Sequence, residues 1–359
     1  MKKFLLLVAT VCLTTLSMRA QTSLVATLTH ADETTEYYGQ DAFVDAVATS
    51  ADGDLITLSA GLFNGTTINK SLTIRGNGAE PAEEATQVIT GVVLEKSADP
   101  DDANHWLNIE GIYFNCEVRI QRPTTKTDLN ILKDLCMKKC TVKSFSSMEY
   151  YPNGAYYGTL KNSSFVHCRF LESFTVFNVS EVSFINSVIF GYGFARGTND
   201  QVNNPKVHMY NSVAIFNKAP DAIGYLSATN SVLVVKGSTK DTSYPFPSTF
   251  SSTNCLITGY LADESKADAM YTKYTPVATQ WMPMTEVFAT LTNYTSFEPT
   301  DDYALTPAAQ AFLGTDGTQV GIYGGAMPYT STVSYPRFAT FTVAGQAVDG
   351  TLAVEIAAE

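Results

Sequence analysis

The sequence predicts an all-β fold in which short parallel strands stack as successive coils of a solenoid. Two observations predict it: a strand–bend–strand motif recurs along the chain, and no helical segment separates its copies. The motif is clearest in VHMYNSVAIFN, residues 207–217, where Asn211 stands between two apolar stretches although Asn is a poor strand former. Closely related stretches are FINSVIF, SATNSVLV and SSTNCLI.

The residue that interrupts each motif predicts a sharp bend. Apolar residues occupy even offsets before this marker and odd offsets after it, so the inward-facing parity flips there. Gly and Asn adopt the left-handed conformation at the lowest cost, which makes each marker a one-residue bend between two strands. The markers fall at Gly76, Gly111, Lys139, Asn162, Asn186, Asn211, Asn230 and Asn254, in steps of 19 to 35 residues.

Stacked coils are expected to bring these markers into one column, about 4.8 Å apart. The predicted structural ladder consists of Asn162, Asn186, Asn211, Asn230 and Asn254, with their amide groups hydrogen-bonded to one another up the stack.

Both ends of such a solenoid need covers, because a bare end exposes strand edges and core. At about residues 40–50, Phe43, Val44 and Val47 form one apolar face at helical spacing and predict a capping helix, and the strand LITLS follows. The tail RFATFTVAGQAVDGTLAVEIAAE predicts a β-hairpin with Asp349-Gly350 at its turn. The expected domains are a β-helix at 21–327 and a hairpin tail at 328–359.

The first 20 residues predict a secretory signal peptide. Lys2 and Lys3 precede the apolar run FLLLVATVCLTTL, which is too short to span a bilayer, and Ala20 offers a small residue before the cleavage point. We therefore expect export to the periplasm, the cell surface or the medium. No other apolar run is long enough for a transmembrane segment.

Composition narrows the classes of partner. The formal net charge of −12 and the lack of a long basic run argue against nucleic acid and anionic membrane surfaces. The mature chain keeps an odd number of cysteines, so at least one is unpaired or pairs between chains. Their spacing matches no zinc pattern, and those beside the predicted bends are expected to be small buried residues. The five are Cys116, Cys136, Cys140, Cys168 and Cys255.

Two segments resemble a known group of proteins. The entrance AFVDAVATSADGDLITLSAGLF, followed by SLTIRG, is similar to the start of right-handed parallel β-helix proteins of the pectin-lyase-like group. The segment DDYALTPAAQAFLGTDGTQVGIYGG looks like their closing segment, and the resemblance covers about residues 40–327. It implies a right-handed parallel β-helix with an N-terminal capping helix and a small C-terminal hairpin. It implies no single activity, because the group contains lyases, hydrolases and inert binders.

Enzymes of this group would need charged residues that project outward from neighbouring coils. From Lys139 onward, the outward columns beside the markers contain no Asp or Glu, so the paired carboxylates of a hydrolase are not visible. A β-eliminating lyase needs a base and a cation, and it stays an alternative. Its candidate catalytic residues are Lys138 and Lys161, expected to share a column, and His208 and Tyr210, expected on one face of one strand.

An acidic loop at residues 99–104 offers weak candidate metal ligands. Asp99, Asp101 and Asp102 supply the oxygen ligands that Ca²⁺ prefers, although their spacing does not fit the D-x-D-x-D pattern. No other cofactor is expected.

The coils differ in length, and most of the extra residues fall 7 to 16 positions after the marker, on one arc of the solenoid. Aromatic faces there suit sugar rings, and guanidinium groups suit uronate or sulfate. The first hypothesis is therefore a non-catalytic exported or surface protein that binds a polysaccharide or surface glycan. The alternatives are the lyase and a purely structural or adhesive protein, in which the tyrosines pack their own loops. The candidate glycan-binding residues are Arg119, Arg122, Tyr150, Tyr151, Tyr156, Tyr157, Arg196, Lys240 and Tyr244.

Overall fold

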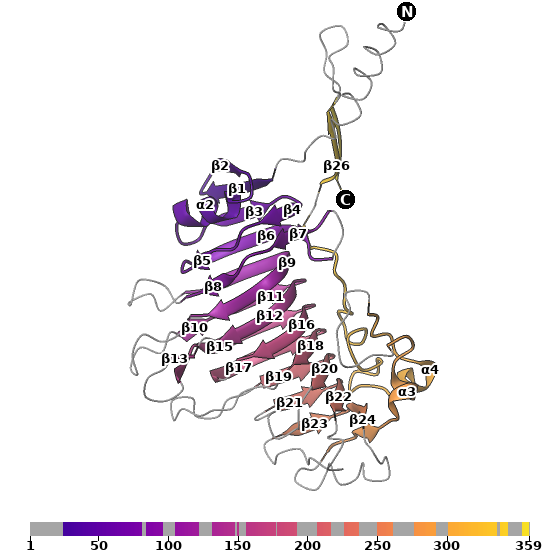
Figure 1. Cartoon of the computed structure of the whole chain (residues 1–359). Coiled ribbons are helices and arrows are strands. Elements are labelled where there is room, and N and C mark those ends of the chain that lie inside the picture. Colours follow the sequence, from indigo (N-terminus) through magenta and orange to yellow (C-terminus); the bar gives the residue numbers. More distant parts are fainter. Residues whose placement is uncertain are drawn as a thin grey trace, which may run out of the picture.

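The chain forms a parallel β-helix, as the computed structural model in Figure 1 shows. Successive coils stack from the N-terminal cap to residue 281 and place their strands in two long parallel sheets. The predicted fold class is thereby confirmed. The structure describes residues 24–80, 84–95, 105–121, 131–147, 149–150, 156–176, 178–191, 207–216, 226–236, 250–260, 276–291, 301–335, 338–343 and 354–358.

Sheet A and sheet B lie on either side of the column of bends, and β9 runs from one sheet into the other. Sheet A contains β3 (Leu55–Leu58), β6 (Leu72–Gly78), the first part of β9 (Leu107–Ile120), β11 (Leu135–Lys138), β15 (Thr159–Val166), β17 (Asn178–Ile185), β19 (Val207–Tyr210), β21 (Leu226–Thr229) and β23 (Ser251–Thr253). Sheet B contains β4 (Gly61–Phe63), β5 (Thr67–Ile68), β7 (Thr86–Val88), β8 (Val92–Leu94), the rest of β9, β12 (Thr141–Ser147), β16 (Arg169–Thr175), β18 (Val188–Gly191), β20 (Val213–Phe216), β22 (Val232–Lys236), β24 (Leu256–Tyr260) and β25 (Gln280–Trp281).

The N-terminal cover contains the predicted helix. Helix α2 (Ala42–Thr49) buries Phe43 and Val47 against the first coil, and Lys70 donates to three carbonyl groups at its C-terminal end. An antiparallel hairpin of β1 (Val25–His30) and β2 (Glu33–Tyr38) lies beside it and pairs with β3. Together they cover the open edge of the first coil.

The interior of the coil is filled by one continuous apolar core. Phenylalanines from neighbouring coils stack or meet edge to face, with ring centroids 5.0 to 6.2 Å apart, as favourable aromatic pairs do. Every member of this cluster is almost completely buried, and the cluster comprises Phe145, Phe165, Phe170, Phe174 and Phe184.

The bends between sheet A and sheet B form one column, which we call the marker corner. The backbone N–H of Asn186 donates to Tyr210 O of the next coil at 3.0 Å, and that of Asn211 donates to Thr229 O at 3.1 Å. The residues at this corner with positive φ are Gly111, Lys139, His167, Asn186, Asn211, Asn230, Asn254 and Ala278. The corner thus follows the predicted frame and extends one coil further, to Ala278. Gly76 lies beside Gly111 but is not among the residues with positive φ.

Asn162 lies outside this column, so its predicted place in the ladder is wrong. It has the expected left-handed conformation, with φ 49°, but it belongs to a second, shorter corner with Asp134 and Glu181. In its coil the marker position is taken by His167, whose N–H donates to Ile185 O at 3.0 Å. The sequence KNSSF has the local chemistry of a bend, and that chemistry does not distinguish the two corners.

The predicted amide ladder is also wrong. The side-chain hydrogen bonds that join neighbouring coils at the marker corner are made by the residue that follows each marker, not by the marker itself. Ser187 Oγ donates to Ile185 O at 2.9 Å and accepts from Cys168 N at 3.0 Å. Ser212 Oγ accepts from Ser187 N at 3.1 Å in the same way. This buried inner ladder consists of Cys140, Cys168, Ser187, Ser212, Ser231 and Cys255.

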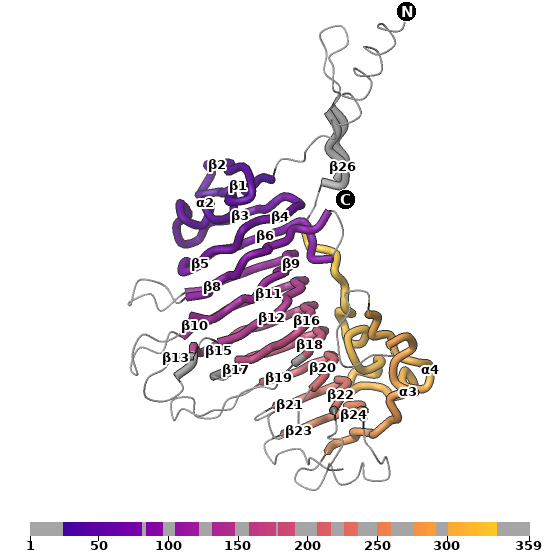
Figure 2. Tube along the Cα trace, in the orientation of Figure 1, coloured from indigo at the N-terminus to yellow at the C-terminus, as the bar shows by residue number. Residues whose placement is uncertain are grey.

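The marker amides instead bond to a returning segment, residues 313–335, which we call the C-terminal strap. Asn186 Nδ2 donates to Ile322 O and Gly324 O, both at 2.8 Å, and Asn254 Nδ2 donates to Leu313 O at 3.2 Å. Figure 2 shows the strap running back beside the coils toward the N-terminal end, where Tyr335 bonds to Gly76 O. It therefore covers the corner over almost the full length of the coil.

Residues 276–291 and 301–312 precede the strap and, with it, cover the outer face of sheet B. They include the short helices α3 (Met284–Val287) and α4 (Pro307–Gln310). The apolar residues that project outward from sheet B are buried under this cover. The sequence did not predict that sheet B would be covered. The combined cluster includes Val188, Val213, Val232, Val287, Phe288, Tyr303, Leu305, Val320 and Ile322.

Beyond the strap, β26 (Phe338–Val343) and β27 (Val354–Ala358) pair antiparallel, as the tail predicted. The turn expected at Asp349-Gly350 and the signal peptide expected at 1–20 lie outside the described residues. The remaining strands are β10 (Ile131–Lys133), which pairs with β15, and the short antiparallel pair β13 (Glu149–Tyr150) and β14 (Tyr156–Tyr157).

Candidate functional site

The outer face of sheet A is the candidate site, because a long row of its outward side chains remains accessible. On sheet B, Val213 and Val232 are completely buried beneath the C-terminal segment. On sheet A, Lys138 and Tyr210 are exposed, and Tyr210 keeps 42% of its surface. The face that is available to a ligand is therefore the one that the C-terminal segment leaves open.

Two rows of outward residues run along sheet A, perpendicular to the strands, with one residue from each coil. The parallel register places members of a row about 4.8 Å apart. The first row, rich in hydroxyl groups, is Asn108, Cys136, Ser164, Ser183, His208, Ser227 and Ser251. The second row, next to the marker corner, is Glu110, Lys138, Val166, Ile185, Tyr210, Thr229 and Thr253.

His208 and Tyr210 share one face of β19, as predicted. Their rings lie 6.2 Å apart between centroids and almost parallel, at 10°. His208 Nε2 lies 3.5 Å from Glu181 Oε2, which comes from the bend in the previous coil. These contacts hold two flat rings side by side on this face, one in the hydroxyl-rich first row and one in the mixed second row.

Lys138 and Lys161 do not share a column, so this part of the lyase hypothesis is wrong. Lys161 stands beside Lys133, and Lys138 stands between Glu110 and Val166. The error arose because Asn162 was the predicted marker of its coil, whereas the marker is His167, five positions later. Lys133 and Glu181 were missed for the same reason, since their places depend on the second corner.

The structure describes only part of the predicted glycan-binding arc. Arg119 lies on β9 and pairs with Glu117, with Nε 2.6 Å from Oε2. The backbones of Tyr150 and Tyr156 are opposite each other in the β13–β14 pair, and Tyr157 is opposite Glu149. Arg122, Tyr151, Arg196, Lys240, Tyr244 and the weak metal candidates Asp99, Asp101 and Asp102 lie outside the described residues.

The ends of the long connections nevertheless share one edge of the coil. They leave from the ends of sheet B strands, such as Phe216 and Lys236, and return to the starts of sheet A strands, such as Leu226 and Ser251. This loop edge lies across the coil from the marker corner and borders sheet A, with the strap on the other side of the molecule (Figure 1).

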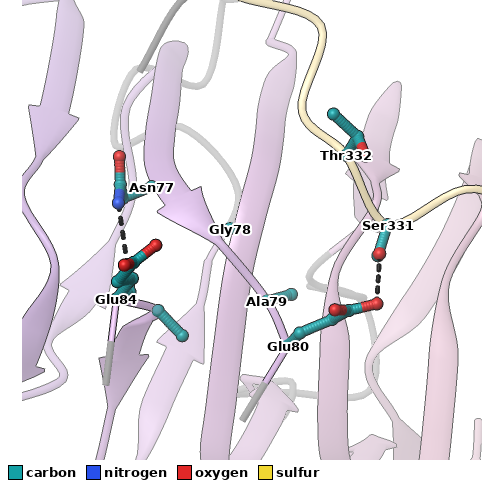
Figure 3. Close-up of a pocket in the computed structure, with 8 residues that line it drawn as sticks. Asn77, Gly78, Ala79, Glu80, Glu84, Ser331 and Thr332 are labelled. Atoms are coloured by element: carbon teal, nitrogen blue, oxygen red, sulfur yellow. Dashed lines mark hydrogen bonds between the residues drawn. The ribbon is translucent and has the colours of Figure 1, made fainter. Parts of the chain in front are cut away.

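A small pocket of about 150 Å³ lies where the strap meets β6, and its lining includes Asn77, Glu80, Glu84 and Ser331. Figure 3 shows Glu80 and Ser331 pointing toward each other across it, and Ser331 Oγ donates to Glu80. Asn77 Nδ2 donates to Glu84 O at 2.8 Å. These groups satisfy one another, so the pocket belongs to the docking of the strap.

Other chemical features of the described residues are few. They contain no group of three or more His, Cys, Asp or Glu residues that could hold a metal ion. No helix in this part of the chain is long and apolar enough to cross a membrane. Neither the models of known protein families nor the curated proteins match this chain.

Proposed function

We propose that the protein is exported and binds a polysaccharide, without cleaving it, on the outer face of sheet A and the adjoining loop edge. The observation that carries the proposal is the stacked pair of His208 and Tyr210 on a face that the C-terminal segment leaves open. Sugar rings present C–H faces that pack on aromatic rings, and their hydroxyl groups seek polar partners beside those rings.

The neighbouring rows support the same ligand class. Ser183 and Ser227 flank His208 in the first row, and Ile185 and Thr229 flank Tyr210 in the second. Hydroxyl groups both donate and accept hydrogen bonds, which suits a partner that also carries hydroxyls. Because the rows follow the coil axis, the ligand best matched to them is an extended chain that lies across several strands.

Binding fits the arrangement better than β-elimination does. An eliminating enzyme needs a base beside a group that stabilises the anion, within reach of one sugar. Lys138 and Lys161 stand in different columns, and His208 is directed toward Glu181. The adhesive alternative differs from our proposal in requiring no glycan.

The proposal predicts that Tyr210→Ala weakens binding about five- to thirtyfold. Loss of one stacking ring removes about 1 to 2 kcal/mol of contact, and each 1.4 kcal/mol corresponds to a factor of ten. The measurement is affinity for a panel of neutral, uronate-containing and sulfated polysaccharides. Tyr38→Ala is the matched control, because Tyr38 is also exposed, at 63%, but lies on the N-terminal hairpin.

Equal affinities for the wild type and Tyr210→Ala would refute the proposed site, and a blank panel would refute glycan binding. If unsaturated uronates were detected by their absorbance in the same samples, the protein would be a lyase and not a non-catalytic binding protein.

A further inference from the structure

We propose that Cys140 and Cys168 form a disulfide bond between neighbouring coils, made while the chain folds and then enclosed in the core of the coil. The proposal is independent of the glycan site. It concerns the inner ladder of the marker corner, where these two cysteines occupy successive positions.

The backbone brings the two residues within disulfide range. Arg169 N donates to Cys140 O at 2.9 Å, and Thr141 is in register with Arg169, so Cys140 and Cys168 are neighbours across the ladder. Neighbouring strands lie about 4.8 Å apart, and a disulfide needs Cα atoms about 4.4 to 6.8 Å apart.

The two side chains also point into the same space. Cys140 Sγ donates to Lys138 O at 3.2 Å, and Cys168 Sγ donates to Val166 O at 3.5 Å, so each thiol bonds the same carbonyl of its own coil. Cys168 Sγ also donates to Met137 O, on the coil of Cys140, at 3.4 Å. Both thiols are free in the structure, so the bond requires each sulfur to rotate away from its carbonyl acceptor and toward the other coil.

The other cysteines have different neighbours in the described part of the chain. Cys255 continues the inner ladder, but it follows Ser231 there. Cys136 projects outward in the first row of sheet A, between Asn108 and Ser164. Cys116 lies on β9 in sheet B, opposite the register shift between Val142 and Ser144 of β12. Among the five described cysteines, register therefore places only Cys140 and Cys168 at successive positions of the ladder.

The closing of the coil around its core determines when the bond can form, because both cysteines belong to that core. Cys140 and Cys168 are 1% and 0% exposed, and Tyr329 and Tyr335 of the strap lie over this part of the corner. Burial raises the pKa of the Cys168 thiol well above its ordinary value, so the folded chain holds little of the reactive thiolate. Oxidation is accordingly expected before the core of the coil closes.

The chemistry is thiol–disulfide exchange with a small-molecule disulfide as the oxidant. The thiolate of one cysteine attacks that disulfide, forms a mixed disulfide and releases one small thiol. The second cysteine thiolate attacks the mixed disulfide and releases the other small thiol. Two protein thiols are oxidised, one small disulfide is reduced to two thiols, and the protons end on the released thiols.

The test is refolding of the reduced, full-length chain in glutathione redox buffer, followed by alkylation under denaturing conditions and peptide mapping. The expected result is a linked pair of peptides that contain Cys140 and Cys168. Both cysteines alkylated, or either one linked elsewhere, would overturn the proposal. Already folded, reduced protein should stay reduced in the same buffer, and rapid cross-linking of it would overturn the enclosure of the two thiols in the core.

Cys168→Ser is the matched variant, because Ser already occupies this position in the coils of Ser187, Ser212 and Ser231. The wild type is expected to melt about 5 °C or more higher when oxidised than when reduced. Cys168→Ser should melt at one temperature in both buffers. A wild type with no redox dependence of melting would contradict the proposal even if the variant failed to fold.

Discussion

The two long edges of the coil are built in different ways. At the marker corner, one residue per coil makes a left-handed bend, the next residue carries the inner ladder, and the strap bonds the outward amides. At the loop edge, connections of different lengths join sheet B to sheet A, beside the open face that carries His208 and Tyr210. The comparison indicates that the regular edge provides stability and that the irregular edge, with sheet A, is available for binding.

The largest expected effect tests the strap side of this comparison. Asn186→Gly keeps the left-handed bend but removes two buried hydrogen bonds to Ile322 and Gly324. We expect the free energy of unfolding to fall by about 2 to 3 kcal/mol, measured by urea denaturation.

The matched control is Asn162→Gly at the second corner, where the amide is exposed and bonds Asp134. Both variants change the unfolded chain equally, so their difference isolates the strap bonds. The control is expected to lose less than about 1 kcal/mol. Equal losses would show that the strap contributes nothing at Asn186.

A somewhat smaller effect is expected from the inner ladder. Ser187→Ala removes the hydroxyl that accepts from Cys168 N and donates to Ile185 O, in a completely buried position. The expected loss is about 2 kcal/mol in the free energy of unfolding. Ser187→Cys should lose less than Ser187→Ala, because Cys already occupies this position in three coils. A cysteine variant as unstable as the alanine variant would contradict the ladder.

The smallest effect is a pH dependence at His167. Burial under the strap lowers the pKa of His167, and the nearby Lys139 lowers it further, while His167 Nε2 bonds Met327 O at 3.0 Å. Hydrogen bonds with the backbone of Met327 and Thr330 raise the pKa of His167 but do not outweigh the effect of burial. The neutral imidazole is therefore favoured in the folded chain.

Because the folded pKa lies below the unfolded value of 6.5, this stabilisation is complete above pH 6.5 and is lost as the pH falls through the folded pKa. His167→Asn, with the residue that the next coil uses, should lose less stability than the wild type between pH 7 and pH 5. The measurement is a melting curve at each pH. If the melting temperatures of the two proteins changed equally with pH, protonation of His167 would not affect stability.

The sequence predicted the features that are local and repeated. The bends at Asn186, Asn211, Asn230 and Asn254 were found because each needs a residue that tolerates positive φ. The error at Asn162 arose because two corners use the same chemistry within one coil. Spacing alone could not identify His167, because Asn162 and His167 in the same coil both tolerate a left-handed bend.

The features that the sequence did not predict depend on contacts between distant residues. Asn186 and Ile322 are 136 positions apart, so the sequence around Asn186 does not identify its hydrogen-bond partner. A usable signal was nevertheless present on sheet B, since Val188, Val213 and Val232 project outward and apolar side chains in such a row need a cover. The same reasoning, applied to the polar rows of sheet A, would have selected the open face.

The most direct test of the division between the two edges is hydrogen exchange of the full-length chain with and without the polysaccharide that the binding panel selects. Our account predicts increased protection in residues 178–185, 207–210 and 226–229 of sheet A, with no change in the strap at 313–335. Protection confined to the strap, or none on sheet A, would contradict it.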